Sequence, residues 1–112
     1  MGLPAAGQVV LVPFPFSDLS HVKMRPAVVL AGAGRNDWIL CQVTSNPYGD
    51  EKAIVITEKD FQNGSLRVTS YARPGKLFTA NASLIAETAG ALKKGKIRKL
   101  IDSVIEILQK GT

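Results

Sequence analysis

Apolar residues along this chain fall into short runs separated by glycine, proline and asparagine, which is the pattern of a mainly β protein. The first two runs, Gln8–Phe16 and Pro26–Leu30, are rich in valine and leucine and predict two strands. A polar connection, Ser17–Arg25, joins them. Because a residue before proline is pushed toward extended geometry, we expect Arg25 at a boundary between loop and strand.

The middle of the chain predicts three more strands. Asp37–Ser45 carries apolar residues on both alternating faces, so we expect a central strand that is buried on two sides. Ala53–Thr57 predicts a short fourth strand, and Ser65–Tyr71 alternates as a half-buried strand does. Between these strands, Ala31–Asn36 predicts a turn, and Glu58–Gly64 predicts a turn or a single helical turn.

The C-terminal part predicts a bent strand and then a helix. Ala72–Thr79 should bend at Pro74–Gly75 and continue as a short strand, while Ser83–Leu92 fits strand or helix, with strand favoured at its start. Apolar residues then recur every three or four positions, which predicts an amphipathic helix from about Lys94 to Gln109, ending near Gly111. Six to seven short strands before one helix predict a small, strongly bent sheet or partly closed barrel.

Length and composition indicate one intracellular domain over residues 1–112. The chain has 112 residues, of which 46% are apolar, enough for one core. A single cysteine, Cys41, excludes an intramolecular disulfide, and no cysteine pair suggests a structural metal, which favours a reducing cytoplasm. Neither a signal peptide nor an apolar run of about 20 residues is present. We therefore expect a cytoplasmic protein with no membrane partner, metal or cofactor.

The net charge of +5 favours a polyanionic partner, such as nucleic acid or an acidic protein. Part of this charge is concentrated near the start of the predicted helix, in Lys93, Lys94, Lys96, Arg98 and Lys99. A run of this kind is more often a solvated helix start than a binding site. The charge therefore supports a polyanionic partner without establishing one.

The connection between the first two strands is dense in groups that move protons or bind anions. Arg25 can hold two phosphate oxygens with its planar fork and stays charged. His21 is the only histidine, and histidine side chains titrate near neutral pH, which suits proton transfer. A solvent-exposed loop histidine with no catalytic role is nevertheless the commoner case. Asp18 could orient either group, but a turn aspartate is commoner still.

Four segments resemble, in their order, spacing and polarity, the PemK/MazF toxins of bacterial and archaeal toxin–antitoxin pairs: GQVVLVPFPFSD, KMRPAVVL, DWILCQVTS and ARPGKLFT. The most specific parts are the Arg-Pro and apolar run at Arg25–Leu30 and the strand that ends in Val43-Thr44-Ser45. The resemblance extends from Gly7 to the terminal helix. It implies a mainly β, small SH3-like barrel (CcdB/PemK-like) with a C-terminal helix, and a homodimer.

The same resemblance implies metal-independent cleavage of single-stranded RNA and inhibition by an acidic antitoxin. In the family, the arginine of the Arg-Pro motif and the threonine or serine ending the third strand are functional. By position these are Arg25 and Thr44, with Ser45 adjacent. Some relatives also carry a functional histidine in the first loop, so His21 is a third catalytic candidate, although its distance from the arginine differs here.

The chemistry explains why such residues are needed. In metal-free RNA cleavage the substrate's own 2′-hydroxyl attacks the phosphate, so a base, an acid and a fixed cation all lower the barrier. Arg25 suits the cationic role at the phosphate. The neutral hydroxyl of Thr44 suits hydrogen bonding to the phosphate or to the 2′-hydroxyl, although an ordinary threonine at a strand end is also a fair interpretation.

Other polar and aromatic residues could line an RNA groove. Tyr48 would serve as a platform on which a base stacks, although a plain loop aromatic is equally common. Arg73 stands about where relatives often place an acid, shortly before a basic residue, here Lys76. This favours RNA binding but removes a candidate general base. The further candidates for RNA binding are Ser20, Lys23, Gln42, Ser45 and Arg67.

Three functions stay open on the sequence. The first is a dimeric toxin endoribonuclease that cuts single-stranded mRNA at short specific sequences and is neutralised by an antitoxin. The second is a toxin of the same fold that binds a protein such as DNA gyrase through apolar residues of the terminal helix. The third is a catalytically inactive relative that binds RNA. The pair Arg25 and Thr44 favours the nuclease.

Overall fold

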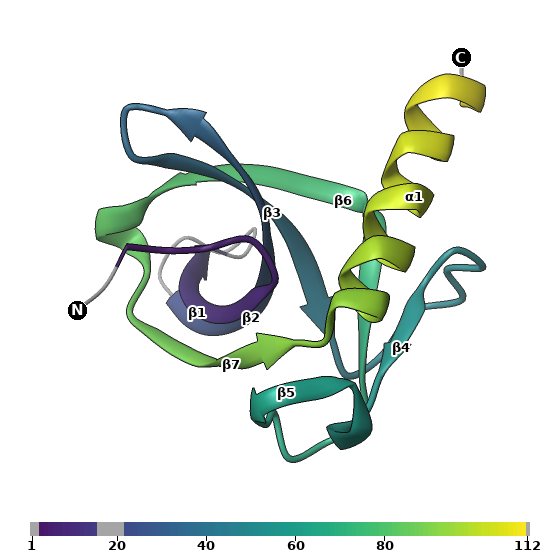
Figure 1. The fold of residues 1–112 in the computed structure, drawn as a ribbon, viewed down its shortest axis with the longest axis horizontal. Coiled ribbons are helices and arrows are strands. Elements are labelled where there is room, and N and C mark those ends of the chain that lie inside the picture. The colour runs from purple at the N-terminus through teal and green to yellow at the C-terminus, as the bar shows by residue number, and fades with distance from the viewer. Residues whose placement is uncertain (1–2, 16–21, 112) are drawn as a thin grey trace.

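The computed structural model describes residues 3–15 and 22–111. In this part of the chain, seven strands form one antiparallel sheet that curls into a half-barrel, and one α-helix follows it (Figure 1). The expectation of a small, strongly bent, mainly β protein is confirmed. The strands are β1 Gln8–Pro15, β2 Val22–Gly34, β3 Asp37–Thr44, β4 Ile54–Ile56, β5 Phe61–Gly64, β6 Ser70–Asn81 and β7 Glu87–Leu92.

Strand β3 is the central strand, as its pattern predicts. The order across the sheet is β4-β6-β3-β2-β1-β7-β5, so β3 lies between β2 and β6. Cys41 and Val43 are fully buried in one apolar cluster, whereas Leu40 is fully buried in a second. Since neighbouring residues of a strand point to opposite faces, both faces of β3 are covered.

The helix α1, Lys94–Lys110, confirms the predicted amphipathic helix to within one residue. Leu100 and Val104 are buried in the larger apolar cluster together with Val9 and Val28 of β1 and β2. Figure 1 shows α1 running beside β6, the strand that it contacts. The chain leaves the helix at Gly111, whose N–H donates to the last turn.

Strand β2 is much longer than predicted, so the placement of Arg25 at a loop boundary is wrong. Arg25 lies inside β2, directly opposite Val12 of β1. Antiparallel pairing continues down to the pair Pro15 and Val22, and this pairing overrides the polar composition of the segment. At its other end, β2 turns into β3 through two residues, Arg35 and Asn36, both in the left-handed region that a tight hairpin requires.

The segment after β4 also differs from the prediction. Glu58–Asp60 forms a single 3₁₀ turn, as expected, but Phe61–Gly64 forms the strand β5 rather than the rest of a turn. The predicted strand Ser65–Tyr71 is wrong over residues 65–69, which connect β5 to β6. Its alternation of apolar and polar residues has another cause, because Leu66 packs against the core from this connection while Val68 stays exposed.

The ambiguous segment Ser83–Leu92 begins with a 3₁₀ turn, Ala82–Leu84, and its strand β7 occupies the end rather than the start. Asn81 caps this turn by accepting a hydrogen bond from Ser83 N–H. Strand β7 then pairs with both β1 and β5, and β5 is the edge strand on that side of the sheet. The favoured strand at Ser83 is therefore wrong, since local capping decides the start of the segment.

Candidate active site

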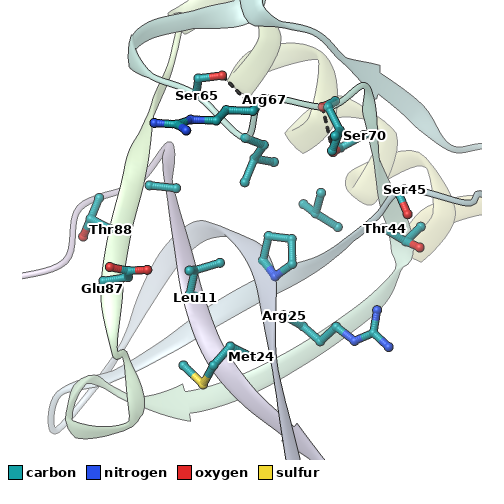
Figure 2. A pocket seen from close by; sticks show the side chains of 15 residues that line it. Leu11, Met24, Arg25, Thr44, Ser45, Ser65, Arg67, Ser70, Glu87 and Thr88 are labelled. Atoms are coloured by element: carbon teal, nitrogen blue, oxygen red, sulfur yellow. Dashed lines mark hydrogen bonds between the residues drawn. The ribbon is translucent and has the colours of Figure 1, made fainter.

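The structure brings four of the predicted site residues to one hollow. Arg25, Thr44, Ser45 and Arg67 line a cavity of about 500 Å³ between the sheet and the β5–β6 connection (Figure 2). Its apolar lining comes from both sides and includes Leu11, Pro26, Val43, Leu66 and Val68. Residues from β2, β3 and the β5–β6 connection, distant in sequence, thus surround one space, which we call the first hollow.

Arg25 and Thr44 lie on the same side of the first hollow. Figure 2 shows the side chain of Arg25 extending toward the edge where Thr44 and Ser45 end β3. Arg25 is half-buried, and its backbone lies in the paired β1–β2 region. A cation carried by a paired strand is held in place more rigidly than one on a loop, which suits a group that must meet a phosphate at a defined position.

The hydroxyl of Thr44 has a defined hydrogen-bonding state. It is largely buried, donates to the carbonyl oxygen of Asn46 at 3.0 Å and accepts from Asn46 N–H at 3.1 Å. Since a hydroxyl has one proton and two lone pairs, its proton is committed and one acceptor position is left. Thr44 therefore shapes the loop after β3 and can still accept a hydrogen bond from a ligand.

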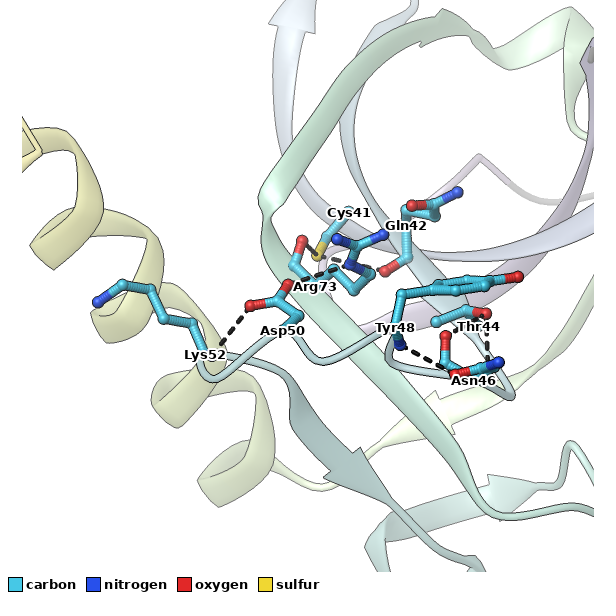
Figure 3. Close-up of polar contacts among 8 residues, drawn as sticks. All are labelled: Cys41, Gln42, Thr44, Asn46, Tyr48, Asp50, Lys52 and Arg73. Atoms are coloured by element: carbon cyan, nitrogen blue, oxygen red, sulfur yellow. Dashed lines mark hydrogen bonds and ion pairs between the residues drawn. The ribbon is translucent and has the colours of Figure 1, made fainter. Parts of the chain in front are cut away.

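Tyr48, Arg73 and Lys76 lie together at a second hollow, next to the loop between β3 and β4. The Nε of Arg73 lies 3.0 Å from Oδ2 of Asp50, and its Cζ lies 5.8 Å from the centroid of the Tyr48 ring (Figure 3). The hydrogen bond from Arg73, together with one from Lys52 N–H, lowers the pKa of Asp50 below its ordinary value. Tyr48 itself is 69% exposed, so its ring is available for stacking.

A wide bulge in β6 places Arg73 and Lys76 at this second hollow. Ala72 is opposite Val43 and Leu77 is opposite Cys41, so the four residues between them face one residue of β3. The predicted bend at Pro74–Gly75 is thus present, but inside one long strand rather than between two. Proline lacks the N–H that regular pairing needs, so it is tolerated at a bulge of this kind.

Cys41 stabilises the bulge and is chemically inert. Its Sγ donates a hydrogen bond to the carbonyl oxygen of Arg73 at 3.1 Å. Burial raises the pKa of the thiol to about 12. Since only the thiolate is a good nucleophile or metal ligand, this cysteine takes no part in the chemistry.

The sequence interpretation missed two carboxylates. Asp50 supplies, from the β3–β4 loop, an acidic partner for Arg73 that the sequence pattern around β6 lacks. Glu87, at the start of β7, lines the first hollow. Neither residue stands in a motif, and only the pairing of distant strands brings them to the site.

The remaining predicted residues are not all brought to these hollows. Gln42 and Lys76 border a third, smaller hollow together with Leu77 and Phe78 of β6. Lys23 is exposed on β2 and lines none of the three. The predicted residues Ser20 and His21, and the neighbouring Asp18, lie outside the described residues.

Two further features concern metals and membranes. Within residues 3–15 and 22–111, no three side chains of the metal-binding types histidine, cysteine, aspartate and glutamate gather in one place. The helices of the same segments include none long and apolar enough to cross a membrane.

The ion pair between Asp50 and Arg73 predicts a pH-dependent contribution to stability. Because the folded-state pKa of Asp50 lies below its ordinary value of 3.8, the pair stabilises the fold above that pH. The contribution is lost as pH falls through the lowered pKa. In urea unfolding, Asp50→Asn should be less stable than wild type at pH 7, and the difference should shrink as the pH is lowered below 3.8. A difference that stayed constant down to pH 2 would contradict the pairing.

Fold and site together define a class of protein: a small curled antiparallel sheet with one C-terminal helix, on which cations and an aromatic ring surround open hollows. Comparison of the sequence with models of protein families identifies one family over nearly the whole chain. The model of the PemK-like, MazF-like toxins of type II toxin–antitoxin systems matches residues 5–108, and the chain belongs to this family. No curated protein sequence matched the chain.

Solved structures show the same fold at low sequence identity. MazF from the MazE–MazF complex (Form-II) of Deinococcus radiodurans is 16% identical, with a TM-score of 0.77 over 98% of this chain and 99% of that one. MazF (Form-I) of the same organism is 20% identical, with a TM-score of 0.71 over 97% and 99%. An endoribonuclease in complex with its cognate antitoxin, from a Mycobacterial species, is 15% identical, with a TM-score of 0.71 over 97% and 96%.

Proposed function

We propose that this protein is a toxin endoribonuclease that cleaves single-stranded mRNA at short specific sequences without a metal. The observation that carries the proposal is the convergence of Arg25, Thr44, Ser45 and Arg67 on the first hollow. Membership of the toxin family supports it, as does the description of a structurally similar protein as an endoribonuclease.

The proposed reaction is attack by the 2′-oxygen of the RNA on the adjacent phosphorus. The 2′-hydroxyl loses its proton, a bond forms to phosphorus, and the 5′-oxygen of the next nucleotide leaves and takes up a proton. The guanidinium of Arg25 holds two non-bridging phosphate oxygens as negative charge develops on them. The remaining acceptor position of Thr44 receives the hydrogen bond of the 2′-hydroxyl and directs its oxygen at the phosphorus.

Proton transfer needs a group that titrates nearer to neutral pH. Asp50 is unsuited, because its lowered pKa makes it a weak base, and Cys41 is buried with a pKa of about 12. Efficient general acid–base catalysis requires a pKa near the working pH. We therefore keep His21 as the candidate for this role, and Ser20 and Lys23 as candidates for binding the RNA beside it.

The second hollow is proposed to bind the RNA strand outside the scissile step. Tyr48 stacks a base, while Arg73, held by Asp50, and Lys76 contact phosphates. Tyr48→Ala should weaken RNA binding by about 1–3 kcal/mol, the usual contribution of one stacked base. The change should raise KM and leave kcat close to wild type. Tyr48→Phe, which keeps the ring, should bind RNA as wild type does, and equal losses in both variants would exclude stacking.

Two partners complete the proposal. An acidic antitoxin is expected to cover the cationic residues around the hollows and so exclude RNA, since complementary charge directs such association. The MazE–MazF complexes of Deinococcus radiodurans, which have the same fold, support the existence of an antitoxin partner. A homodimer is proposed from the family alone, and a solution mass near 12.0 kDa at micromolar concentration would contradict it.

The experiment that tests the proposed function is incubation of the purified protein with a long single-stranded RNA in excess EDTA. Discrete cuts, mapped at nucleotide resolution, would establish a metal-independent endoribonuclease and its recognition sequence. The fragments should end in a 2′,3′-cyclic phosphate and a free 5′-hydroxyl. RNA that stayed intact would favour a toxin that binds a protein target or an inactive relative that only binds RNA.

A further inference from the structure

Arg67 and Glu87 place opposite charges at the first hollow, and the proposed reaction uses neither of them. Both side chains are exposed and line the cavity, one from the β5–β6 connection and one from β7. Figure 2 shows the guanidinium of Arg67 reaching toward β7, with the carboxylate of Glu87 at the same wall. Among the described residues, the two do not form an ion pair with one another. Their charges are therefore available to a ligand between them.

The backbone of Arg67 has a conformation that usually favours glycine. Its φ is 65°, in the left-handed region where glycine is preferred and other residues are strained. The conformation is stabilised locally, because Arg67 N–H donates to Oγ of Ser65 at 2.8 Å. The Ser65 hydroxyl in turn donates to Oε1 of Glu58 at 3.1 Å. A glycine would fit this position without strain, yet the chain carries a long cation that extends over the hollow.

Glu87 and Arg25 lie on opposite sides of the first hollow (Figure 2). Glu87 is opposite Leu11 of β1, and Leu11 is opposite Pro26, the residue after Arg25. Two strand spacings, about 10 Å, therefore separate the two positions. The side chain of Arg25 also extends away from Glu87, toward Thr44 and Ser45 (Figure 2), so a phosphate held by Arg25 lies on the far side from this carboxylate. This arrangement suits contact with the base of a nucleotide whose phosphate lies at Arg25.

We propose that the first hollow binds one guanine base of the RNA, next to the scissile phosphate. The carboxylate of Glu87 accepts hydrogen bonds from N1–H and the N2 amino group, and the guanidinium of Arg67 donates to O6 and N7. The apolar side chains of Leu11, Pro26 and Leu66 contact the faces of the base. The inference rests on the proposed function, since it assigns part of the sequence specificity to the same site.

Guanine is favoured because its hydrogen-bonding edges match both charged groups. Its O6 and N7 form an acceptor pair for a guanidinium, the commonest specific contact to a base. It also presents two adjacent N–H donors, which a carboxylate accepts in a bidentate manner. Uracil would place carbonyl oxygens beside the carboxylate, and adenine would place a ring acceptor there. Cytosine offers a single amino group, so it fits less well than guanine.

Two variants and one control test this assignment. Glu87→Gln keeps the size of the side chain but replaces one acceptor with a donor. Arg67→Gly removes the guanidinium and suits the left-handed backbone, so a loss of fold is not expected. Glu106→Gln makes the same chemical change as the first variant at an exposed position on α1, away from the hollow.

The experiment is equilibrium binding of 2′-O-methyl hexanucleotides that cannot be cleaved through their 2′-oxygens. All are uridine except for one central position, which is G, A, C or U. Wild type and Glu106→Gln should bind the guanine oligonucleotide about tenfold or more tightly than the others, as for one bidentate base contact. Glu87→Gln should lose that preference, and Arg67→Gly should bind the guanine oligonucleotide more weakly. Equal binding of all four by wild type, or an unchanged preference in Glu87→Gln, would overturn the inference.

The two proposals fail in different ways. If the protein binds the guanine oligonucleotide preferentially but leaves unmodified RNA intact, the proposed endoribonuclease activity is contradicted and the proposed guanine site is supported. Conversely, if wild type and Glu87→Gln cut RNA at the same sequences, the endoribonuclease activity is supported and the guanine site is contradicted.

Discussion

Replacing Arg25 by alanine is expected to lower the rate constant of RNA cleavage by about 10²–10³-fold, the usual loss when one group that stabilises a developing oxyanion is removed. The physical reason is that Arg25 carries the cation on the side of the first hollow where Thr44 ends β3. Among the described residues that line the hollow, the other arginine, Arg67, extends toward β7 instead (Figure 2). The measurement is single-turnover cleavage of a mapped RNA site in EDTA.

Arg25→Lys provides the matched control. It keeps the charge and loses the bidentate geometry, so its rate should fall between those of wild type and Arg25→Ala. Arg98→Ala removes a cation that is exposed on α1 and outside the hollows, and its rate should equal that of wild type. If Arg25→Ala cleaved RNA as fast as wild type, Arg25 would have no role at the transition state.

Leu100→Ala is expected to lower the free energy of unfolding by about 2–5 kcal/mol, the range for a leucine truncated in a packed core. Leu100 is 1% exposed and lies in the apolar cluster that joins α1 to the sheet. The loss comprises the transfer of the removed carbon atoms and the cavity that they leave. Urea unfolding followed by circular dichroism would measure it, and the midpoint should shift with little change in slope.

Leu108→Ala is the control for this substitution. Leu108 lies on the same helix but is 66% exposed, so its truncation should change stability by no more than about 0.5 kcal/mol. Equal losses in the two variants would contradict the burial that distinguishes the two faces of α1. A small loss in Leu100→Ala alone would show that the helix does not depend on this contact.

The parts of the fold that the sequence predicted well are those with a strong local pattern. The two-sided apolar character of Asp37–Ser45 predicted a central strand, and β3 occupies that place. The recurrence of apolar residues in the terminal segment predicted α1 to within one residue. In both cases the period of the apolar residues follows directly from which face is buried, so no knowledge of distant partners is needed.

The elements that were wrong are those decided by pairing. Ser65–Tyr71 alternates like a strand, yet residues 65–69 connect two strands, with Arg67 in the left-handed region. The strand β5, Phe61–Gly64, has no strand-like composition and exists because it pairs with β7. Alternation of apolar and polar residues reflects which side chains contact apolar surface. A connection that lies over a core can therefore show the same alternation as a strand.

For the candidate site, the resemblance of the sequence to the toxin family singled out Arg25 and Thr44 by position, and the chemistry of a guanidinium and a hydroxyl supported both. The sequence also named Tyr48, Arg73 and Lys76 as a cationic, aromatic set. Only the tertiary structure decided that Asp50 holds Arg73 and that Glu87 faces the first hollow. The first contact joins the β3–β4 loop to β6, and the second position depends on the pairing of β7 with β1. The register of strand pairing, which no local pattern encodes, determines which side chains meet across such long stretches of chain.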